Sequence, residues 1–248
     1  MKILPVLDLL DGIAVRGVAG KRNAYRPVES QLVNNADPLL VAEAFRDNFG
    51  LTEFYLADLD AILHDRPNLS IYEALVNHGF DLIVDAGLRD IDRAGELFAH
   101  GVSAVIAGLE TIPSPELLRG LTQTFHSDRV LFSLDLKNGT PLGDLRPWET
   151  SDPFEIGRRA VDAGMTRMII LDLAAVGVHD GISTIPLCQR LQDHSPQLQI
   201  VTGGGVRDTD DLKQLAVIGI DGVLIASALH NGRIDAATIR SFETHVAD

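Results

Sequence analysis

A strict alternation of short apolar runs with helical stretches is the feature that most limits the fold of this chain. Eight apolar runs occur, and a stretch with helical signals follows each of them. Such alternation predicts parallel strands joined by helices, and eight units are enough to close a barrel. The predicted strands span residues 2–8, 53–58, 81–85, 103–107, 129–135, 167–172, 198–203 and 221–226.

Helix-start signals stand between these runs. The side chain of an Asp, Asn or Ser can accept a hydrogen bond from a free N–H group of the first turn, and proline suits the first helical position. The predicted N-caps are Asp37, Ser114 and Asp152, each followed by proline, and Asn68, Asp90 and Asp208. A doubly wound open sheet would show the same alternation, so the pattern alone leaves two architectures open.

An internal repeat favours the barrel. Three segments of the first half match segments of the second half in the same order, and chance likeness explains one such match better than three. Two similar halves of four units predict an α/β fold, a single (β/α)8 TIM barrel domain over residues 1–248. The matched pairs are Leu7-Asp8-Leu9 with Leu134-Asp135-Leu136, Asp58-Leu59 with Asp172-Leu173, and Gly87-Leu88-Arg89-Asp90 with Gly205-Val206-Arg207-Asp208.

Composition excludes several classes of partner. The formal net charge is −14, and so acidic a surface repels nucleic acid and anionic membranes. The single cysteine, Cys188, allows neither a disulfide framework nor a cysteine-based metal site. No GxGxxG follows the first strand and no P-loop is present, so we expect no cofactor and no metal. Without a signal peptide or a membrane-length apolar run, we expect a cytoplasmic protein, either a monomer or a homodimer.

Carboxyl groups stand at the ends of several predicted strands, where TIM barrels carry their working groups. Asp8 and Asp135 end strands that lie four apart, so they should face each other across the barrel mouth. A small sugar between them would meet one carboxyl on each side, as acid–base catalysis requires. Asp58, Asp85 and Asp172 also end strands and are candidate substrate contacts. The competing interpretation is that such acids only cap loops, and for Asp58 and Asp172 it is the favoured one.

A glycine run after the seventh strand predicts a phosphate site. Thr202-Gly203-Gly204-Gly205 is followed, one strand later, by Ile225-Ala226-Ser227-Ala228. Glycines let backbone N–H groups approach an anion closely, and the last two loops of TIM barrels often bind phosphate in this way. The predicted phosphate-binding residues are Gly203, Gly204, Gly205, Ala226 and Ser227.

The corresponding place in the first half differs. There the chain reads Asp85-Ala86-Gly87 and Ala107-Gly108-Leu109-Glu110. Two carboxylates would repel a phosphate, so we expect this half to bind no second phosphate, or to bind a neutral or cationic group.

Two long loops after the first and fifth strands carry basic and aromatic residues that could close over a substrate. Arg16 and Trp148 are candidate substrate contacts, and a solvated polar loop is the competing interpretation. The other candidates in βα loops are Lys21, Arg22, Arg26, Arg146, His64 and His179.

These residues resemble the histidine-biosynthesis barrel family of HisA and HisF over nearly the whole chain. The likeness is carried by Ile3-Leu4-Pro5-Val6-Leu7-Asp8-Leu9, Asp58-Leu59-Asp60-Ala61, Ser133-Leu134-Asp135, Gly203-Gly204-Gly205-Val206 and Gly222-Val223-Leu224-Ile225. The second of these segments is more like HisA. The resemblance implies an Amadori rearrangement of an aminoaldose phosphate, with Asp8 and Asp135 as acid and base and no metal or cofactor. Whichever carboxyl donates its proton should have a raised pKa.

The positions at which this sequence departs from that family are clustered. HisA acts on a substrate with a phosphate at each end, and its strand 3 and 4 loops carry a second glycine run and a Gly-Thr. Here these positions read Asp85-Ala86-Gly87 and Gly108-Leu109, and strand 6 ends in Leu171-Asp172 in place of Thr-Asp. The chain thus resembles a diverged HisA/HisF-related subgroup of organisms with methanopterin-type C1 metabolism.

Several functions remain open at this point. The favoured one is an isomerase or related lyase acting on a mono-phosphorylated sugar. Alternatives are a genuine ProFAR isomerase of histidine biosynthesis and a non-catalytic protein that binds a phosphorylated metabolite. A HisF-like cyclase served by a glutaminase partner is the weakest, since nothing in the sequence identifies a partner surface.

Overall fold

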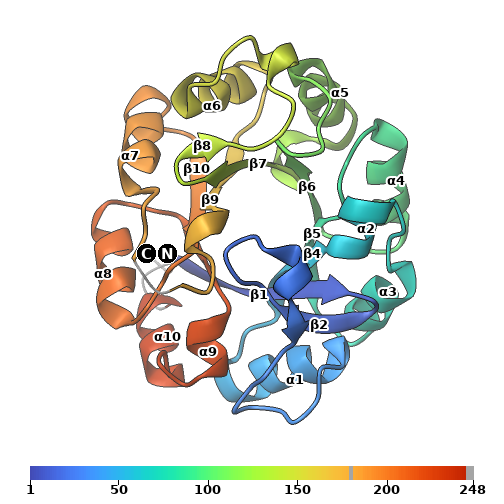
Figure 1. Cartoon of the computed structure of the whole chain (residues 1–248), viewed down its shortest axis with the longest axis vertical. Helices are drawn as coiled ribbons and strands as arrows, with labels where there is room; N and C mark the ends of the chain where they lie inside the picture. Colours follow the sequence, from blue (N-terminus) through green and yellow to red (C-terminus); the bar gives the residue numbers. More distant parts are fainter. Residues whose placement is uncertain (179–180, 244–248) are drawn as a thin grey trace.

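Eight parallel strands close into a ring in the computed structural model, which describes residues 1–178 and 181–243 (Figure 1). The last strand pairs with the first, where Lys2 lies opposite Gly222 and Pro5 opposite Ile225, so the sheet has no open edge. The predicted TIM barrel is confirmed and the open sheet is excluded. The barrel strands are β1 (Lys2–Leu10), β4 (Glu53–Asp58), β5 (Asp81–Asp85), β6 (Ala104–Gly108), β7 (Val130–Lys137), β9 (Arg167–Asp172), β10 (Gln199–Gly203) and β11 (Gly222–Ile225).

Helices surround the ring and cover its outer face (Figure 1). The α-helices are α1 (Pro38–Phe49), α2 (Leu59–His64), α3 (Leu69–Asn77), α4 (Ile91–Ala99), α5 (Pro115–Phe125), α6 (Pro153–Asp162), α7 (Ile185–His194), α8 (Thr209–Val217), α9 (Ser227–His230) and α10 (Ala236–Glu243). Short 3-10 turns are η1 (Arg22–Ala24), η2 (Ser127–Arg129), η3 (Arg146–Trp148) and η4 (Leu173–Ala175). No helix in the described ranges has the length and apolar character needed to cross a membrane.

Most of the predicted helix caps are present. The carboxylates of Asp37, Asp90, Asp152 and Asp208 each accept a hydrogen bond from an N–H group of the following turn. Helices α5 and α3 begin where predicted, but the side chains of Ser114 and Asn68 make no such bond. The Asn68 amide donates instead to Asp58 and Asp60, so tertiary contacts override local capping at that position.

Two hairpins that the sequence analysis did not predict extend the internal repeat. β2 (Ile13–Arg16) pairs antiparallel with β1, and β8 (Thr140–Pro141) pairs antiparallel with β7. The connecting turns, Asp11-Gly12 and Asn138-Gly139, have nearly equal positive φ angles of 53° and 74°, and 52° and 74°. Asp-Gly and Asn-Gly suit tight hairpin turns because Asp, Asn and Gly tolerate positive φ. A third short strand, β3 (Arg26–Pro27), pairs with β2.

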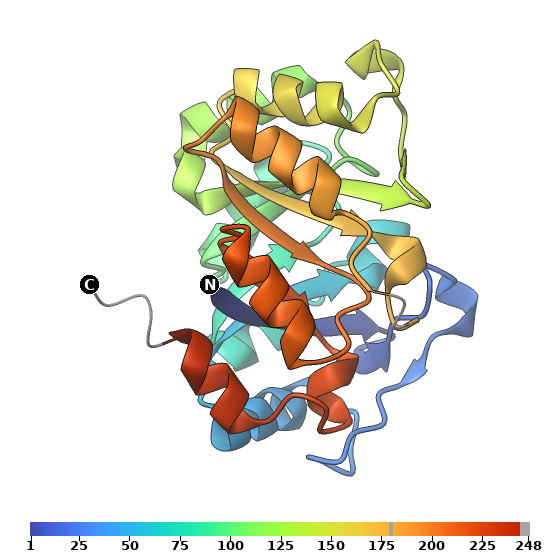
Figure 2. The ribbon, with the colours of Figure 1, turned by 90° about the vertical axis from the view of Figure 1, so that its left-hand side faces the viewer.

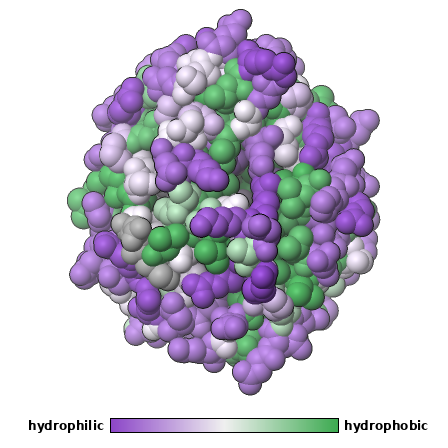
Figure 3. Space-filling view, viewed as in Figure 1, coloured by the Kyte–Doolittle hydropathy of each residue, from purple (hydrophilic) through white to green (hydrophobic). Residues whose placement is uncertain are grey.

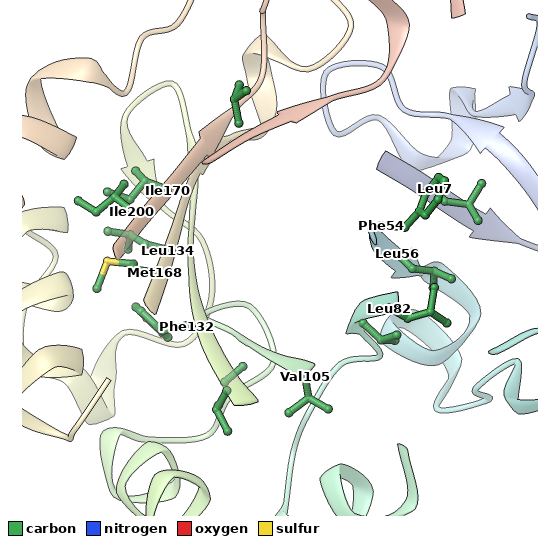
Figure 4. Packing of buried hydrophobic residues seen from close by; sticks show 14 of the residues in the cluster. Leu7, Phe54, Leu56, Leu82, Val105, Phe132, Leu134, Met168, Ile170 and Ile200 are labelled. Carbon is green, nitrogen blue, oxygen red and sulfur yellow. The ribbon is translucent and has the colours of Figure 1, made fainter. Parts of the chain in front are cut away.

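The core has two layers, separated by the wall of strands. Strand residues alternate between the layers because successive side chains of a strand point to opposite faces. Residues such as Leu7, Leu56 and Leu134 face the helices (Figure 4). Residues such as Tyr55 and Ile169 face the barrel axis. The alternation therefore decides, for each strand-end residue, whether it can reach the barrel mouth.

Candidate active site

A cavity opens at the carboxyl ends of the strands. The arrowheads of the strands, the β2–β3 segment and η4 lie at the same end of the molecule (Figure 2). On this face hydrophilic residues cover most of the outline, and hydrophobic residues gather near the middle and to one side (Figure 3). The predicted site residues that line the cavity are Asp8, Arg16, Asp85, Asp135, Gly204, Gly205, Ala226 and Ser227.

Asp8 and Asp135 face this cavity from opposite walls. β1 and β7 lie four strands apart around the ring in either direction. Asp8 shares its side of β1 with the cavity-lining Val6. On β7, Asp135 alternates with Leu134, which packs in the outer layer. The predicted catalytic pair thus shares one cavity.

Both carboxyls are easier to protonate than an ordinary aspartate. Burial raises the pKa of Asp8 to about 7, and the backbone of Gly17 offsets part of this rise. Burial, with the negative charge of Asp85, raises the pKa of Asp135 to about 8. The Ser133 hydroxyl opposes that rise by donating to Oδ1 of Asp135 at 2.7 Å. Two carboxyls that titrate near neutrality can exchange protons with a bound ligand at physiological pH.

Gly17 fits closely over Asp8. A Cβ atom at this glycine would lie 2.9 Å from Oδ2 of Asp8 and 3.5 Å from the Tyr25 hydroxyl. The segment after β2 therefore packs directly against the carboxyl and leaves no room there for a larger residue.

Asp58 and Asp172 do not line the cavity. They follow Leu56 and Ile170 in the alternation, so they point outward. Asp172 accepts hydrogen bonds from the N–H groups of Asn138, Gly139 and Ala174, at 2.8–3.0 Å, and so holds the β7–β8 turn. Their candidate role as substrate contacts is not supported by this geometry, whereas the favoured loop-capping role is.

Asp58 is fully buried among donors. It accepts hydrogen bonds from the N–H of Ala61, from the backbone and side chain of Asn68, and from the Tyr72 hydroxyl. We expect Asp58→Asn to lower the free energy of unfolding by about 2 kcal/mol or more, because an amide replaces an acceptor that every neighbour needs. Urea unfolding followed by circular dichroism measures this. Asp47→Asn, at an exposed acid of α1, is the control and should change stability by less than about 0.5 kcal/mol.

Trp148 and Gly203 also lie away from the cavity, contrary to the sequence-based expectation. The indole of Trp148 is fully buried and packs against Phe132, with ring centroids 5.3 Å apart. Its loop folds back onto the outer layer, so the residue is part of the core. A Cβ at Gly203 would lie 2.7 Å from Cβ of Leu224, so that glycine permits the approach of two strands. His64 is exposed on α2, and His179 lies outside the described residues.

Free backbone N–H groups face the cavity at the predicted phosphate site. Gly204 and Gly205 adopt φ angles of 78° and 87°. Within the described residues, the N–H groups of Gly204, Gly205, Ser227 and Ala228 donate to no carbonyl or side chain. Unsatisfied N–H groups at the edge of a cavity favour an anion. Arg16 and His230 line the same cavity, and the charge of Arg16 acts on His230 at the end of α9.

The mirrored half offers fewer such donors. The N–H of Gly87 donates to Oδ1 of Asp85 at 3.0 Å, and the N–H of Leu109 donates to the Ser133 carbonyl at 2.9 Å. Asp85 itself lines the cavity with a pKa that burial raises to about 6. Two of the four corresponding N–H groups are therefore occupied in this half, whereas none of the four is occupied at the predicted phosphate site.

Tyr55, Tyr25 and Glu110 are among the cavity residues that were not singled out from the sequence as substrate contacts. Tyr55 shares its side of β4 with Ala57 and could have been found from the alternation along that strand. Glu110 accepts a bidentate ion pair from Arg22, of which one bond measures 2.9 Å, across the mouth of the cavity. That pairing joins residues 22 and 110, and no local pattern signals it.

A TIM barrel with facing acids in a cavity at the carboxyl ends of its strands is typical of a barrel enzyme whose active site is that cavity. Comparison with known proteins gives the family. Residues 2–235 match the family model described as "Histidine biosynthesis protein", and the chain belongs to this family. The predicted relationship to HisA and HisF is therefore confirmed, and so is the prediction that the chain is an isomerase of the HisA type.

The relatives cover the whole length of the chain. An uncharacterized protein of Methanocaldococcus jannaschii is 31% identical over 242 residues, which are 96% of this chain and 97% of that protein. The Methanosarcina mazei relative is 30% identical over 240 residues, 94% of this chain and 93% of its own length. It is named as an imidazole-4-carboxamide isomerase (ProFAR isomerase), and the compound in that name carries two phosphoribosyl groups. A Methanosarcina acetivorans protein of the same name is 31% identical over 252 residues, 97% of this chain and 98% of its own.

Proposed function

We propose that this protein is an intramolecular aldose–ketose isomerase of the Amadori type that acts on a mono-phosphorylated sugar or sugar-amine. The observation that carries the proposal is the placement of Asp8 and Asp135 on opposite walls of one cavity, Asp8 half-buried and Asp135 buried, both with a pKa raised to near neutrality. The binding of a single phosphate is supported by the free N–H groups at one end of the cavity, those of Gly204, Gly205, Ser227 and Ala228.

The chemistry needs one acid and one base. The acid protonates the ring oxygen of the aldose derivative as the ring opens, and the base then removes the proton from C2. Return of a proton to C1, with loss of the proton from the C2 hydroxyl, gives the ketose, so the reaction consumes no external reagent. Asp135, with the higher pKa, is the better proton donor, and Asp8 the better base.

Proton exchange with solvent tests this directly. The protein is incubated in D2O with a panel of mono-phosphorylated aldoses and their glycosylamines, and each mixture is followed by 1H NMR. We expect one of these compounds to give a ketose product that carries deuterium at the carbon that received the proton. Binding without conversion or exchange across the panel would instead favour a non-catalytic metabolite-binding protein.

The pH dependence should be bell-shaped. The base must be ionised, so kcat/KM should rise as pH passes about 7, where Asp8 titrates. The acid must be protonated, so kcat/KM should fall as pH passes about 8, where Asp135 titrates. Initial rates between pH 5 and 10 measure both limbs. A flat profile across this range would contradict the assignment of these carboxyls.

A bis-phosphorylated substrate is the second candidate, because the printed names of the Methanosarcina relatives contain two phosphoribosyl groups. Expression in a strain that lacks ProFAR isomerase decides between the two. We expect no rescue of growth without histidine, because Asp85 and Glu110 line the cavity where the mirrored phosphate would lie. Rescue would support the histidine-pathway substrate.

A further inference from the structure

One end of the cavity gathers carboxyl groups around Gly108. A Cβ at this glycine would lie 3.4 Å from Oδ2 of Asp135 and 3.5 Å from Oδ2 of Asp85. Glu110 follows two residues later and lines the same cavity. Two carboxyls, from β5 and β7, therefore meet beside Gly108, and a third, from the loop after β6, lines the same cavity.

The oxygen atoms that face this space have no donors. The Oδ1 atoms of Asp85 and Asp135 accept from Gly87 and Ser133, but within the described residues neither Oδ2 atom accepts a hydrogen bond. Tyr55 gives a second, independent observation. Only 6% of Tyr55 is exposed, it lines the cavity, and its hydroxyl has no hydrogen-bond partner in the described part of the chain. An unpaired hydroxyl on a buried tyrosine that lines the cavity, beside carboxylate oxygens without donors, indicates a place for a polar group of a ligand.

A loop supplies the positive charge that the barrel wall does not place beside these carboxyls. Arg22, in η1, reaches across the mouth to Glu110, and its positive charge also acts on Asp85 and Asp135. Its side chain is 26% exposed. A guanidinium held by a surface loop can leave such a position, whereas the three carboxyls belong to the strands and their ends.

We propose that this acidic end binds an ammonium group of the substrate, recognised by Asp85, Glu110 and the Tyr55 hydroxyl in exchange for the Arg22 guanidinium. The inference rests on the proposed function for the other end, where the phosphate binds. Together they define the substrate class as amino sugars, or sugar-amines, with one phosphate and an amino group far from it. A divalent cation fits less well, because no three His, Cys, Asp or Glu side chains in the described ranges are arranged to hold a metal.

A matched pair of ligands tests the proposal on the full-length protein. Isothermal titration with glucosamine 6-phosphate and glucose 6-phosphate compares an ammonium with a hydroxyl at one carbon. We expect the amino sugar to bind at least ~10-fold more tightly at pH 7, because charge-assisted hydrogen bonds are stronger than neutral ones. Equal affinities would overturn the inference.

Substitutions test which residues cause the preference for the amino sugar. Asp85→Asn keeps an oxygen that can accept from Gly87, and Glu110→Gln changes a side chain at the cavity mouth, so both should fold. In the double variant we expect the preference to vanish while the affinity for inorganic phosphate is unchanged. Arg22→Gln should tighten glucosamine 6-phosphate binding, because it removes the competing cation. A preference that survives the double variant, or weaker amino-sugar binding by Arg22→Gln, would refute the exchange.

Different results would contradict the proposed function and the proposed ammonium site. If neither inorganic phosphate nor either sugar phosphate binds, the phosphate end of the proposed function is wrong. Glucosamine and glucose without phosphate, compared by chemical-shift perturbation in 1H–15N spectra, then decide the acidic end alone. A shift of the Gly87 and Gly108 signals by glucosamine only would support ammonium binding, and identical responses to both sugars would oppose it.

Discussion

Replacement of Asp8 or Asp135 by Asn is expected to lower kcat by about 10³-fold once the substrate is known, since acid–base groups contribute roughly 10²–10⁴-fold. Each carboxyl faces the cavity from its own wall, Asp8 from β1 and Asp135 from β7. The double variant should lose little more than either single variant, because the two groups act in one proton transfer sequence. Binding of inorganic phosphate should persist in all three.

Stability provides the control for this loss. Burial raises the folded-state pKa of Asp135 to about 8, well above the ordinary value of 3.8, so the folded protein binds the proton more tightly than the unfolded chain. The carboxyl therefore destabilises the fold progressively as pH rises from about 4 to about 8. Asp135→Asn should match the natural protein in stability near pH 4 and exceed it at pH 8. Lost activity together with lost stability at pH 8 would indicate a structural role instead.

Ser227→Asp should weaken the binding of inorganic phosphate by about 100-fold, through repulsion between a carboxylate and an anion at close range. Ser227 begins α9 and lines the cavity beside the free N–H groups of Gly204 and Gly205. Ser227→Asn, which has a similar size and no charge, should weaken binding by less than ~10-fold. Unchanged affinity in Ser227→Asp, measured by isothermal titration, would place the anion elsewhere.

Much of the barrel could be predicted from local pattern alone. Four predicted N-caps make their bonds, and three predicted strands, 53–58, 81–85 and 167–172, have the observed bounds. The repeat places Asp8 and Asp135 correctly because closure of eight strands fixes which strands lie opposite each other. Alternation, helix-start residues and closure are all properties that neighbouring residues encode.

The wrong predictions of substrate contacts at Asp58 and Asp172 have one physical reason. Asp58 and Asp172 end their strands one residue out of phase with the cavity-facing positions, so they point toward the helices. Counting back from Asp58 to Leu56 and Phe54, against Ala57 and Tyr55, would have exposed this. Trp148 is different, because its loop could have covered the mouth or the outer layer, and only packing against Phe132 decides between them. The Arg22–Glu110 ion pair joins distant loops and has no local signal.

The bond between the Asp85 carboxylate and the N–H of Gly87 has a consequence for how such barrels diverge. One short side chain both occupies an amide that an incoming anion would need and adds a negative charge beside it. A duplicated half-barrel can therefore change the kind of chemical group it accepts through substitutions at the ends of its strands, such as Asp85 and Glu110, while the strands keep their places. Substrates with one or two anionic ends are thus neighbours in sequence space, separated by fewer mutations than their chemical difference suggests.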